Sequence, residues 1–412
     1  MAEIKKFKGL NNMTSPERMA PGELVVALDV DIDHTGRLLS RTGRTIVNAT
    51  PCHSLFSYPG GTFLMQGTAM KAVEADLSLT TVQTLRSSNN ITYDFLNGVA
   101  YFSNGVDTGR LVGRTPKTWG VAAPVGQPSA ALAYGTLGAG RYLYALTFLR
   151  NDGHESGTGI SGQIDLTAPG GVLLNNIEVS TNPDVTTKAI YISSRDGEVL
   201  YRSAIVPNTQ TAVVISDEPN AGVPLTTQFA GPPPPGNIVR IFNGIAYIIA
   251  ENVVYYSDPY NLELFRPDVN FMQFPGQVTL WDHVNDGIYV ATADTDTVDG
   301  TTWFLSGTRP DQFVGAAVFN YGAVFGTSDA IETTFLGKQG EKEGRSAVLW
   351  ISRHGVCLGG DGGNVQNLTE MRHSFPSAVR GASLIRRARG MIQYMTALQG
   401  TGNADNAYVE TI

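Results

Sequence analysis

Apolar and polar residues alternate along much of the chain in short runs, which is the pattern of β-strands. Near the N-terminus, residues 28–32 alternate apolar and acidic side chains, residues 34–36 supply a turn, and residues 37–41 begin a return strand. The preceding residues 7–12 show no periodicity, and we interpret them as an arm that lies on another surface. The pattern therefore predicts an N-terminal arm followed by a hairpin.

A repeated hairpin signal indicates a repetitive architecture. The sequence LNGVAY at 96–101 closely matches FNGIAY at 242–247, and Asn-Gly adopts the positive φ angles of a tight hairpin at little cost. Weaker copies, each a glycine followed by an apolar strand, begin at Gly61, Gly287, Gly322, Gly355 and Gly390. Spacings of about 35–45 residues, each holding several short strands, are typical of β-propeller blades. The alternative is a pair of β-sandwiches whose hairpins recur by coincidence.

The long gap between the two Asn-Gly copies predicts an inserted domain. Its apolar runs at 141–148, 177–180, 188–193 and 212–215 are separated by turns, which favours a small β-sandwich. The sequence GPPPPG at 231–236 then gives a stiff, extended exit. The predicted organisation is an all-β chain with an N-terminal arm, a propeller interrupted by a sandwich, and a tail, over residues 1–22, 23–136, 137–230, 231–398 and 399–412.

Composition supports β-structure and limits the classes of partner. Of 412 residues, 46 are Gly and 21 are Pro, while only 16% are charged, which is low for a globular protein and unlike a helical bundle. The net charge of −8 argues against a basic face that embraces nucleic acid, but it is compatible with a tube through which DNA slides. Cys52 and Cys357 lie far apart, which indicates two thiols made in a reducing cytoplasm. We expect no signal peptide and no membrane-spanning segment.

Two acidic clusters are candidates for ion or sugar binding. Asp29, Asp31 and Asp33 match the start of a calcium loop, but the glycine and the distal glutamate of that loop are missing. Whether they bind an ion stays open, and the alternative is one solvated strand face carrying all three carboxylates. The second cluster consists of Asp294, Asp296 and Asp299 before Gly300. It resembles the Asp-box turn of sialidase-like propellers, but that turn has one residue between Asp and Gly, and here the two adjoin. The pattern therefore favours a polar hairpin tip over an Asp-box.

No pattern of catalytic or metal-binding residues stands out. The six histidines have no second ligand at helical spacing, and no nucleophile elbow, P-loop or dinucleotide fingerprint is present. The sequence does not exclude a pair of carboxylates for glycoside cleavage, because the two partners can lie far apart in the chain. One basic cluster lies near the C-terminus and consists of Arg380, Arg386, Arg387 and Arg389. We interpret it as a solvated face or an intersubunit salt-bridge surface, and the alternative is phosphate binding. We therefore expect no enzyme, no cofactor and no catalytic, cofactor-binding or metal site.

Three parts of the chain, within residues 7–43, 144–157 and 256–265, carry a resemblance to a known family. FKGLNN at 7–12, PER at 16–18, ELVVALDVDID at 23–33, GRL at 36–38 and RTG at 41–43 resemble the start of bacteriophage tail nozzle proteins, also called tail tubular protein B, of short-tailed phages. In mid-chain, YALTF at 144–148 and DGHESG at 152–157 resemble a fibronectin-like module. YSDPY at 256–260 with LF at 264–265 extends the similarity toward the C-terminal half.

The resemblance implies a structural virion protein whose function lies in its assembled shape. It implies a propeller with an inserted domain, a homo-oligomeric ring of six copies below a tail adaptor, and a central channel for genome ejection. The partners would be the adaptor, tail fibre proteins and DNA that passes without sequence-specific binding, and the location would be the virion tail after synthesis in the host cytoplasm. The alternative function is a carbohydrate-binding or carbohydrate-cleaving propeller of a phage or cell-surface system.

Overall fold

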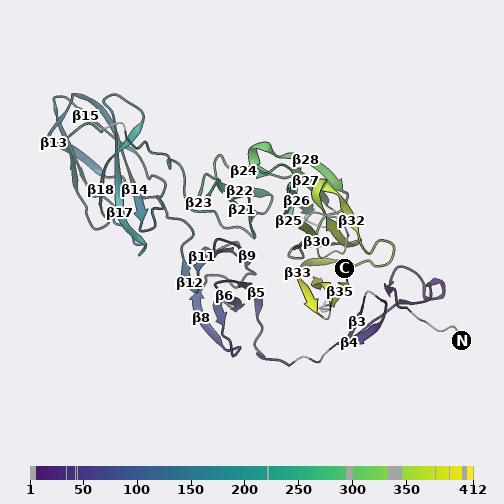
Figure 1. The fold of residues 1–412 in the computed structure, drawn as a ribbon. Coiled ribbons are helices and arrows are strands. Elements are labelled where there is room, and N and C mark those ends of the chain that lie inside the picture. The colour runs from purple at the N-terminus through teal and green to yellow at the C-terminus, as the bar shows by residue number, and fades with distance from the viewer. Residues whose placement is uncertain are drawn as a thin grey trace. The chain divides into compact units, whose positions relative to one another are not determined.

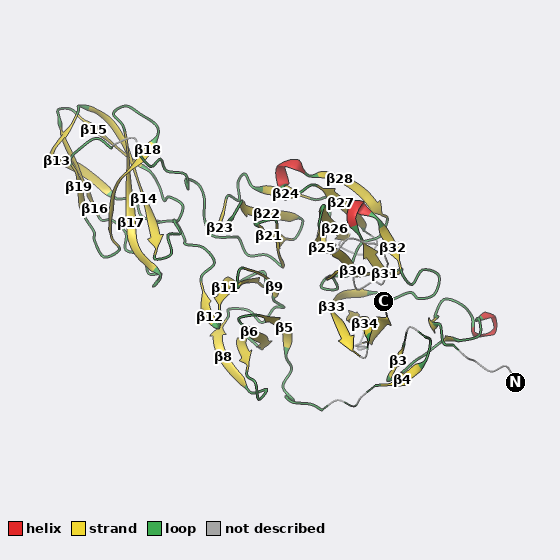
Figure 2. Cartoon of the chain, in the orientation of Figure 1, coloured by secondary structure: helices red, strands yellow, loops and turns green. Residues whose placement is uncertain are grey.

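The computed structural model describes residues 6–33, 35–41, 43, 45–219, 222–293, 300–332, 346–375, 377–388, 390–400 and 406–411. These residues form an all-β protein whose only helical segments are short 3-10 turns, such as Pro16–Arg18 and Pro310–Gln312 (Figure 2). The chain divides into two compact units. Unit 1 comprises residues 1–51, 249–253 and 273–412, and unit 2 comprises residues 52–248 and 254–272.

Unit 2 contains two antiparallel meanders in which consecutive strands are neighbours (Figure 1). The first consists of β5 (His53–Tyr58), β6 (Gly61–Gln66), β7 (Ala69–Val73) and β8 (Leu79–Thr84). The second consists of β9 (Thr92–Leu96), β10 (Val99–Ser103), β11 (Thr108–Val112) and β12 (Thr115–Lys117). One apolar cluster draws buried side chains from both sheets, including Phe63 and Phe102, so the two meanders share a core.

A third meander follows the predicted exit from the insert. It contains β20 (Ile238–Phe242), β21 (Ile245–Ala250), β22 (Val253–Asp258) and β23 (Asn261–Phe265), and β24 (Phe271–Gln273) pairs with β22. Its buried side chains, among them Val239 and Phe265, pack with Tyr101 and Trp119 from the neighbouring part of unit 2.

Both Asn-Gly pairs form the predicted two-residue hairpins. Asn97 and Gly98 have φ angles of 50° and 77° between β9 and β10, and Asn243 and Gly244 have 48° and 72° between β20 and β21. Positive φ at both central residues is the type I′ geometry, whose twist matches that of the flanking strands. The repeated sequence thus encodes the first turn of two different meanders.

Between the second and third meanders, seven strands form two sheets. One sheet has the order β13 (Ser129–Leu137), β16 (Gly170–Asn175), β19 (Val213–Ile215). The other has the order β15 (Gly162–Leu166), β14 (Gly140–Arg150), β17 (Val185–Ser193), β18 (Leu200–Pro207). A single apolar cluster takes buried side chains from all seven strands, so the two sheets enclose one core. We call this part the two-sheet domain.

One strand predicted for this domain is wrong. Residues 177–180 run outside the sheets, although Ile177 is buried in the common core. The Ile177 amide donates to the carbonyl of Thr211, and the Ser180 amide donates to the side chain of Asn208. The backbone hydrogen bonds of this segment therefore go to a loop and a side chain, not to a β-ladder.

Unit 1 contains two further four-stranded meanders and a three-stranded sheet. The first has β25 (Gln277–Val284), β26 (Gly287–Ala293), β27 (Thr301–Ser306) and β28 (Val314–Phe319). The second has β29 (Asp329–Glu332), β30 (Ser346–Ser352), β31 (Gly355–Gly359) and β32 (Val365–Asn367). The third sheet has β33 (Ala378–Ala388), β34 (Met391–Gly400) and β35 (Asn406–Thr411).

Of the weaker glycine copies, Gly322 is wrong as a strand start. Residues 323–325 lie in the connection between β28 and β29, where the Val324 amide donates to the Ile351 carbonyl and Gly326 turns the chain with a φ of 82°. Ala323 and Val324 are buried, so their apolar pattern reflects core packing and not a strand. Gly61, Gly287 and Gly355 each begin a strand, and Gly390 stands directly before β34.

The N-terminal part of unit 1 forms the arm and the predicted hairpin. β1 (Gly9–Leu10) pairs in parallel with β2 (Glu23–Leu24), and β3 (Val30–Ile32) pairs antiparallel with β4 (Leu38–Ser40). The hairpin is confirmed, although its strands are shorter than the alternating pattern. The Phe7 amide donates to the Gly36 carbonyl, which joins the start of the arm to the hairpin turn.

Candidate functional site

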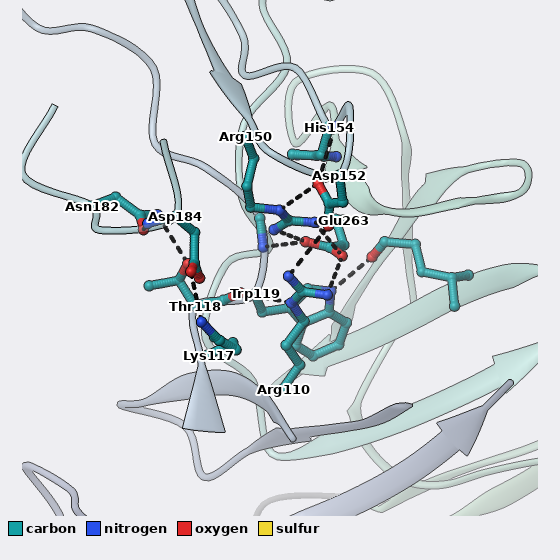
Figure 3. A network of polar contacts seen from close by, with 12 residues as sticks. Arg110, Lys117, Thr118, Trp119, Arg150, Asp152, His154, Asn182, Asp184 and Glu263 are labelled. Carbon is teal, nitrogen blue, oxygen red and sulfur yellow. Dashed lines mark hydrogen bonds and ion pairs between the residues drawn. The ribbon is translucent and has the colours of Figure 1, made fainter. Parts of the chain in front are cut away.

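A buried ionic cluster in unit 2 joins the two-sheet domain to the meanders (Figure 3). Arg150, the last residue of β14, makes a bidentate pair with Glu263 on β23: Nη1 lies 2.7 Å from Oε2 and Nη2 lies 2.9 Å from Oε1. The Arg150 side chain is 2% exposed and that of Glu263 is 10% exposed. Paired, charge-assisted hydrogen bonds of this geometry fix both distance and orientation. We call the cluster the ionic junction.

A second arginine and the chain after β12 complete the environment of Glu263. Arg110 on β11 places Nη1 3.1 Å from Glu263 Oε1, and its Nε donates to the Thr118 carbonyl. The Gly120 amide donates to Glu263 Oε2, and the Trp119 indole donates to the Leu262 carbonyl. Both carboxylate oxygens of Glu263 are thus satisfied, which lets a charge stay buried between strands of three sheets.

Asp152 balances the second arginine charge. Its Oδ1 accepts from Arg150 Nε at 2.8 Å, and its Oδ2 lies 3.7 Å from Arg110 Nη2. Burial alone would raise the pKa of Asp152, but the hydrogen bond and charge of Arg150 outweigh it and lower the pKa to about 2. Burial would lower the pKa of Arg150, and the hydrogen bonds that it donates to Glu263 and Asp152 raise it instead. The junction therefore holds two cations and two anions that stabilise each other's charged forms.

His154 is the titratable group at the edge of the junction. Its amide donates to Asp152 Oδ1, while its Nε2 is buried and has no hydrogen-bond partner among the described residues. Burial lowers the pKa of His154, and the charge of Glu263 only partly offsets this effect. Burial therefore favours the neutral form of the ring beside four charged groups.

A second ion pair reinforces the same contact between the two-sheet domain and β12. Lys117 Nζ lies 2.6 Å from Asp184 Oδ1, and the Asn182 side chain donates to Thr118 Oγ1 (Figure 3). Asn182 Oδ1 also accepts from the Asp184 amide, which holds the acceptor carboxylate in place. The two-sheet domain is thus tied to the β11–β12 edge at two polar points.

The ionic junction has a structural role. Its acids and bases neutralise one another, so they fix the orientation of the two-sheet domain on the meanders of unit 2. Of the junction residues, only Asp152 and His154 lie in a segment that the sequence singles out, the DGHESG motif of the family resemblance. Arg110, Arg150 and Glu263 carried no signal, because β11, β14 and β23 bring them together from distant positions.

The acidic N-terminal cluster does not present three carboxylates on one solvated face, as that alternative required. Asp31 on β3 is buried and lies 2.7 Å from Arg41 Nε and 3.6 Å from Arg386 Nη1. Asp33 Oδ1 accepts from the Thr35 amide, the Thr35 hydroxyl and the Arg37 amide, so it closes the hairpin turn. Asp29 has a φ of 54° and lies outside the short β3, so the strand alternation does not extend to it.

The other predicted candidates have separate positions. Arg380, Arg386 and Arg387 lie on β33, and Arg386 forms the salt bridge with Asp31. Asp294, Asp296, Asp299, His34 and Arg389 lie outside the described residues. Within the described ranges, no group of three or more His, Cys, Asp or Glu residues could hold a metal ion. That part of the chain also contains no helix long and apolar enough to cross a membrane.

Three of the four tryptophans are buried in the cores. Trp119, Trp281 and Trp350 are each at most 2% exposed. Trp119 packs beside Tyr101 and against the edge of Phe265, and Trp350 packs beside Tyr289. These three indoles are therefore covered by the protein itself.

Comparisons with known proteins identify no family. No family model and no curated protein matches the chain. Among solved structures, the chain is similar to the AfRom2 CNH domain, with 8% identity, a TM-score of 0.28, and coverage of 88% of this chain and 94% of that one. It is similar to an α-L-arabinofuranosidase of Fusarium graminearum (12% identity, TM-score 0.25) and an α-L-arabinanase of Penicillium chrysogenum (14%, 0.24), each over 78% of this chain and 92% of that one. We draw no conclusion from TM-scores this low.

Proposed function

We propose that this protein is a structural subunit of a phage tail nozzle or hub, whose copies assemble into a homo-oligomeric ring around a channel for genome ejection. In this proposal the meanders are blades of a β-propeller, and the two-sheet domain is a fibronectin-like sandwich inserted between two blades. Radial repetition of meanders is one way in which a β-protein leaves few exposed strand edges. The family resemblance of the N-terminal segment supplies the tail assignment.

The observation that carries the proposal is the use that the chain makes of its ionic and aromatic side chains. The ion pair of Arg150 and Glu263 fixes the two-sheet domain against the meander that contains β23. Three of the four tryptophans are buried in cores, where they cannot stack on a sugar ring. Such an interior suits a structural protein that must keep one shape while DNA passes through its channel.

Exposed aliphatic side chains in the N-terminal segment support assembly. Five of them are between 52% and 81% exposed: Val25, Val26, Leu28, Ile46 and Val47. Apolar side chains that are exposed in this way are available for burial by a partner. In the proposed ring they are covered by a neighbouring copy, the tail adaptor lies above, and DNA passes without base-specific contacts.

The alternative is a carbohydrate-binding or carbohydrate-cleaving propeller. The names of two similar solved structures are those of arabinan-degrading enzymes, but their likeness to this chain is too slight to favour that function. The two proposals differ in what they require: a sugar site needs accessible aromatic rings and carboxylates in one concavity, and a nozzle needs a ring-forming interface.

Electron microscopy of the chain, purified from virions or co-expressed with tail adaptor proteins, tests the proposal. A closed ring of about six subunits stacked on the adaptor is the expected result. Discrete particles without a ring, with the tail partners present, would overturn it. A glycan-binding screen on the same preparation then tests the alternative, for which saturable binding of one sugar class is the expected result.

A further inference from the structure

The N-terminal arm and hairpin, residues 6–41, contact the rest of unit 1 through a few polar groups. Asn12 exchanges two side-chain hydrogen bonds with the backbone of Ser374, at 2.8 and 2.9 Å, and its amide donates to the Arg372 carbonyl. Arg372 Nη1 donates to the Lys8 carbonyl at 3.3 Å. Asp31 Oδ2 lies 3.6 Å from Arg386 Nη1 and forms a salt bridge with it. These contacts specify where the arm binds, and the neutral hydrogen bonds among them contribute only modestly to stability.

The chain after the arm runs directly into unit 2. Residues 45–52 and Gly43 are all exposed, and none belongs to a strand, until β5 begins at His53. The eleven peptide steps from Arg41 to Cys52 can span up to about 36–40 Å when extended. The arm is thus bound by one unit and tethered to the other through a long, exposed connection.

Such a connection permits exchange of the arm between copies. Every copy carries the same Arg372, Ser374 and Arg386, so an arm can make identical contacts on a neighbour. The exchange would therefore lose none of the contacts seen within one chain, while the tether would link the two subunits. In a ring, this head-to-tail arrangement closes on itself and gives each subunit one arm to donate and one to accept.

The exposed aliphatic residues favour a second copy as the occupant. Val25, Val26 and Leu28 follow β2, and Ile46 and Val47 lie on the tether, so they flank the hairpin on both sides. Burial of exposed Val, Leu and Ile side chains against a partner is favourable in water. A tether that crosses from one subunit to the next would place these residues at the seam between them.

We propose that the arm of each subunit binds unit 1 of the neighbouring copy, through the contacts of Asn12 and Asp31 with Ser374 and Arg386, and that residues 45–51 cross the seam. The inference rests on the proposed ring and names the segment that builds its interface. It also gives the basic residue Arg386 an intersubunit role.

Cross-linking between differently tagged copies tests the exchange. Chains carrying Asn12→Cys with one tag are co-expressed with chains carrying Ser374→Cys with another tag, both in a Cys52→Ser background, and are treated with a short bismaleimide. Cys357 is buried and its pKa is raised to about 12, so it does not compete for the reagent. Arm exchange predicts a cross-linked dimer that carries both tags.

A chain that carries both Asn12→Cys and Ser374→Cys separates the two proposals. If electron microscopy shows the ring but this chain cross-links only within itself, or not at all, arm exchange is wrong and the ring stands. If no ring forms with the tail partners present, the proposed function itself fails. Arg386→Gln should reduce the mixed dimer several-fold, and Arg380→Gln on the same strand serves as the matched control that should leave it unchanged.

Discussion

Arg150 and Glu263, 113 positions apart in the chain, form a bidentate ion pair with N–O distances of 2.7 and 2.9 Å in the interior of unit 2. Arg150 closes the longest strand of the two-sheet domain, and Glu263 belongs to the meander that follows it. The pair therefore connects two parts of the fold that share no sheet. Its removal should affect stability more than any exposed salt bridge of the chain.

Glu263→Gln should destabilise unit 2 by about 3–5 kcal/mol, because it leaves two buried guanidinium groups with one carboxylate. Urea unfolding followed by circular dichroism gives the free energy, and hydrogen exchange of residues 140–155 localises the effect. Glu198→Gln is the matched control, since Glu198 is an exposed partner of Arg141 and surface pairs contribute up to about 1 kcal/mol. Equal losses for both variants would contradict the structural role of the junction.

The stability of unit 2 should fall as the pH drops below about 6.5, the usual pKa of histidine, in part because of His154. Burial lowers the pKa of His154 in the folded protein, so the unfolded chain binds its proton first and acid favours unfolding. Above that pH both states are neutral at this position and the contribution disappears.

His154→Gln should therefore flatten the acid side of the stability curve and leave its slope unchanged between pH 7 and 8. Burial also lowers the pKa of His53, which lies in unit 2, so a part of the acid sensitivity will persist. The groups that face His154 are Arg110, Arg150, Asp152 and Glu263. Identical curves for the variant and the parent between pH 5 and 6.5 would show that His154 does not titrate in this way.

Gly98→Ala should cost about 1–2 kcal/mol through backbone strain alone. Gly98 has a φ of 77°, where an L-residue is disfavoured, and an added Cβ would meet no atom within 4 Å. Gly231→Ala is the control, because that site is equally open and its φ lies outside the left-handed region. Thermal unfolding of the two variants should show a lowered midpoint for the first and little change for the second.

The two thiols should differ sharply in reactivity. Cys52 is exposed, whereas burial raises the pKa of the Cys357 thiol to about 12 and shields it from reagents. Mass spectrometry after brief treatment with iodoacetamide should show one label on the folded protein and two after denaturation. Rapid addition of two labels to the folded protein would contradict the buried position of β31.

Local features of the fold, such as hairpin turns, can be predicted from the sequence. Asn97-Gly98 and Asn243-Gly244 specify their hairpins because their φ preferences act within four residues. Ile177 and Val324 were wrongly placed in strands because a buried irregular segment has the same apolar pattern as a strand. The ionic junction could not be predicted, since nothing in the neighbourhood of Arg110 or Glu263 in the sequence marks its partner.

Native mass spectrometry of the chain co-expressed with tail adaptor proteins tests the central claim most directly. The account predicts a discrete assembly whose mass contains a whole-number multiple, six being expected, of the 44.1 kDa subunit. Truncation of residues 1–41 should convert that assembly to single subunits. A species containing one copy of the full chain, with the adaptor present, would contradict the account.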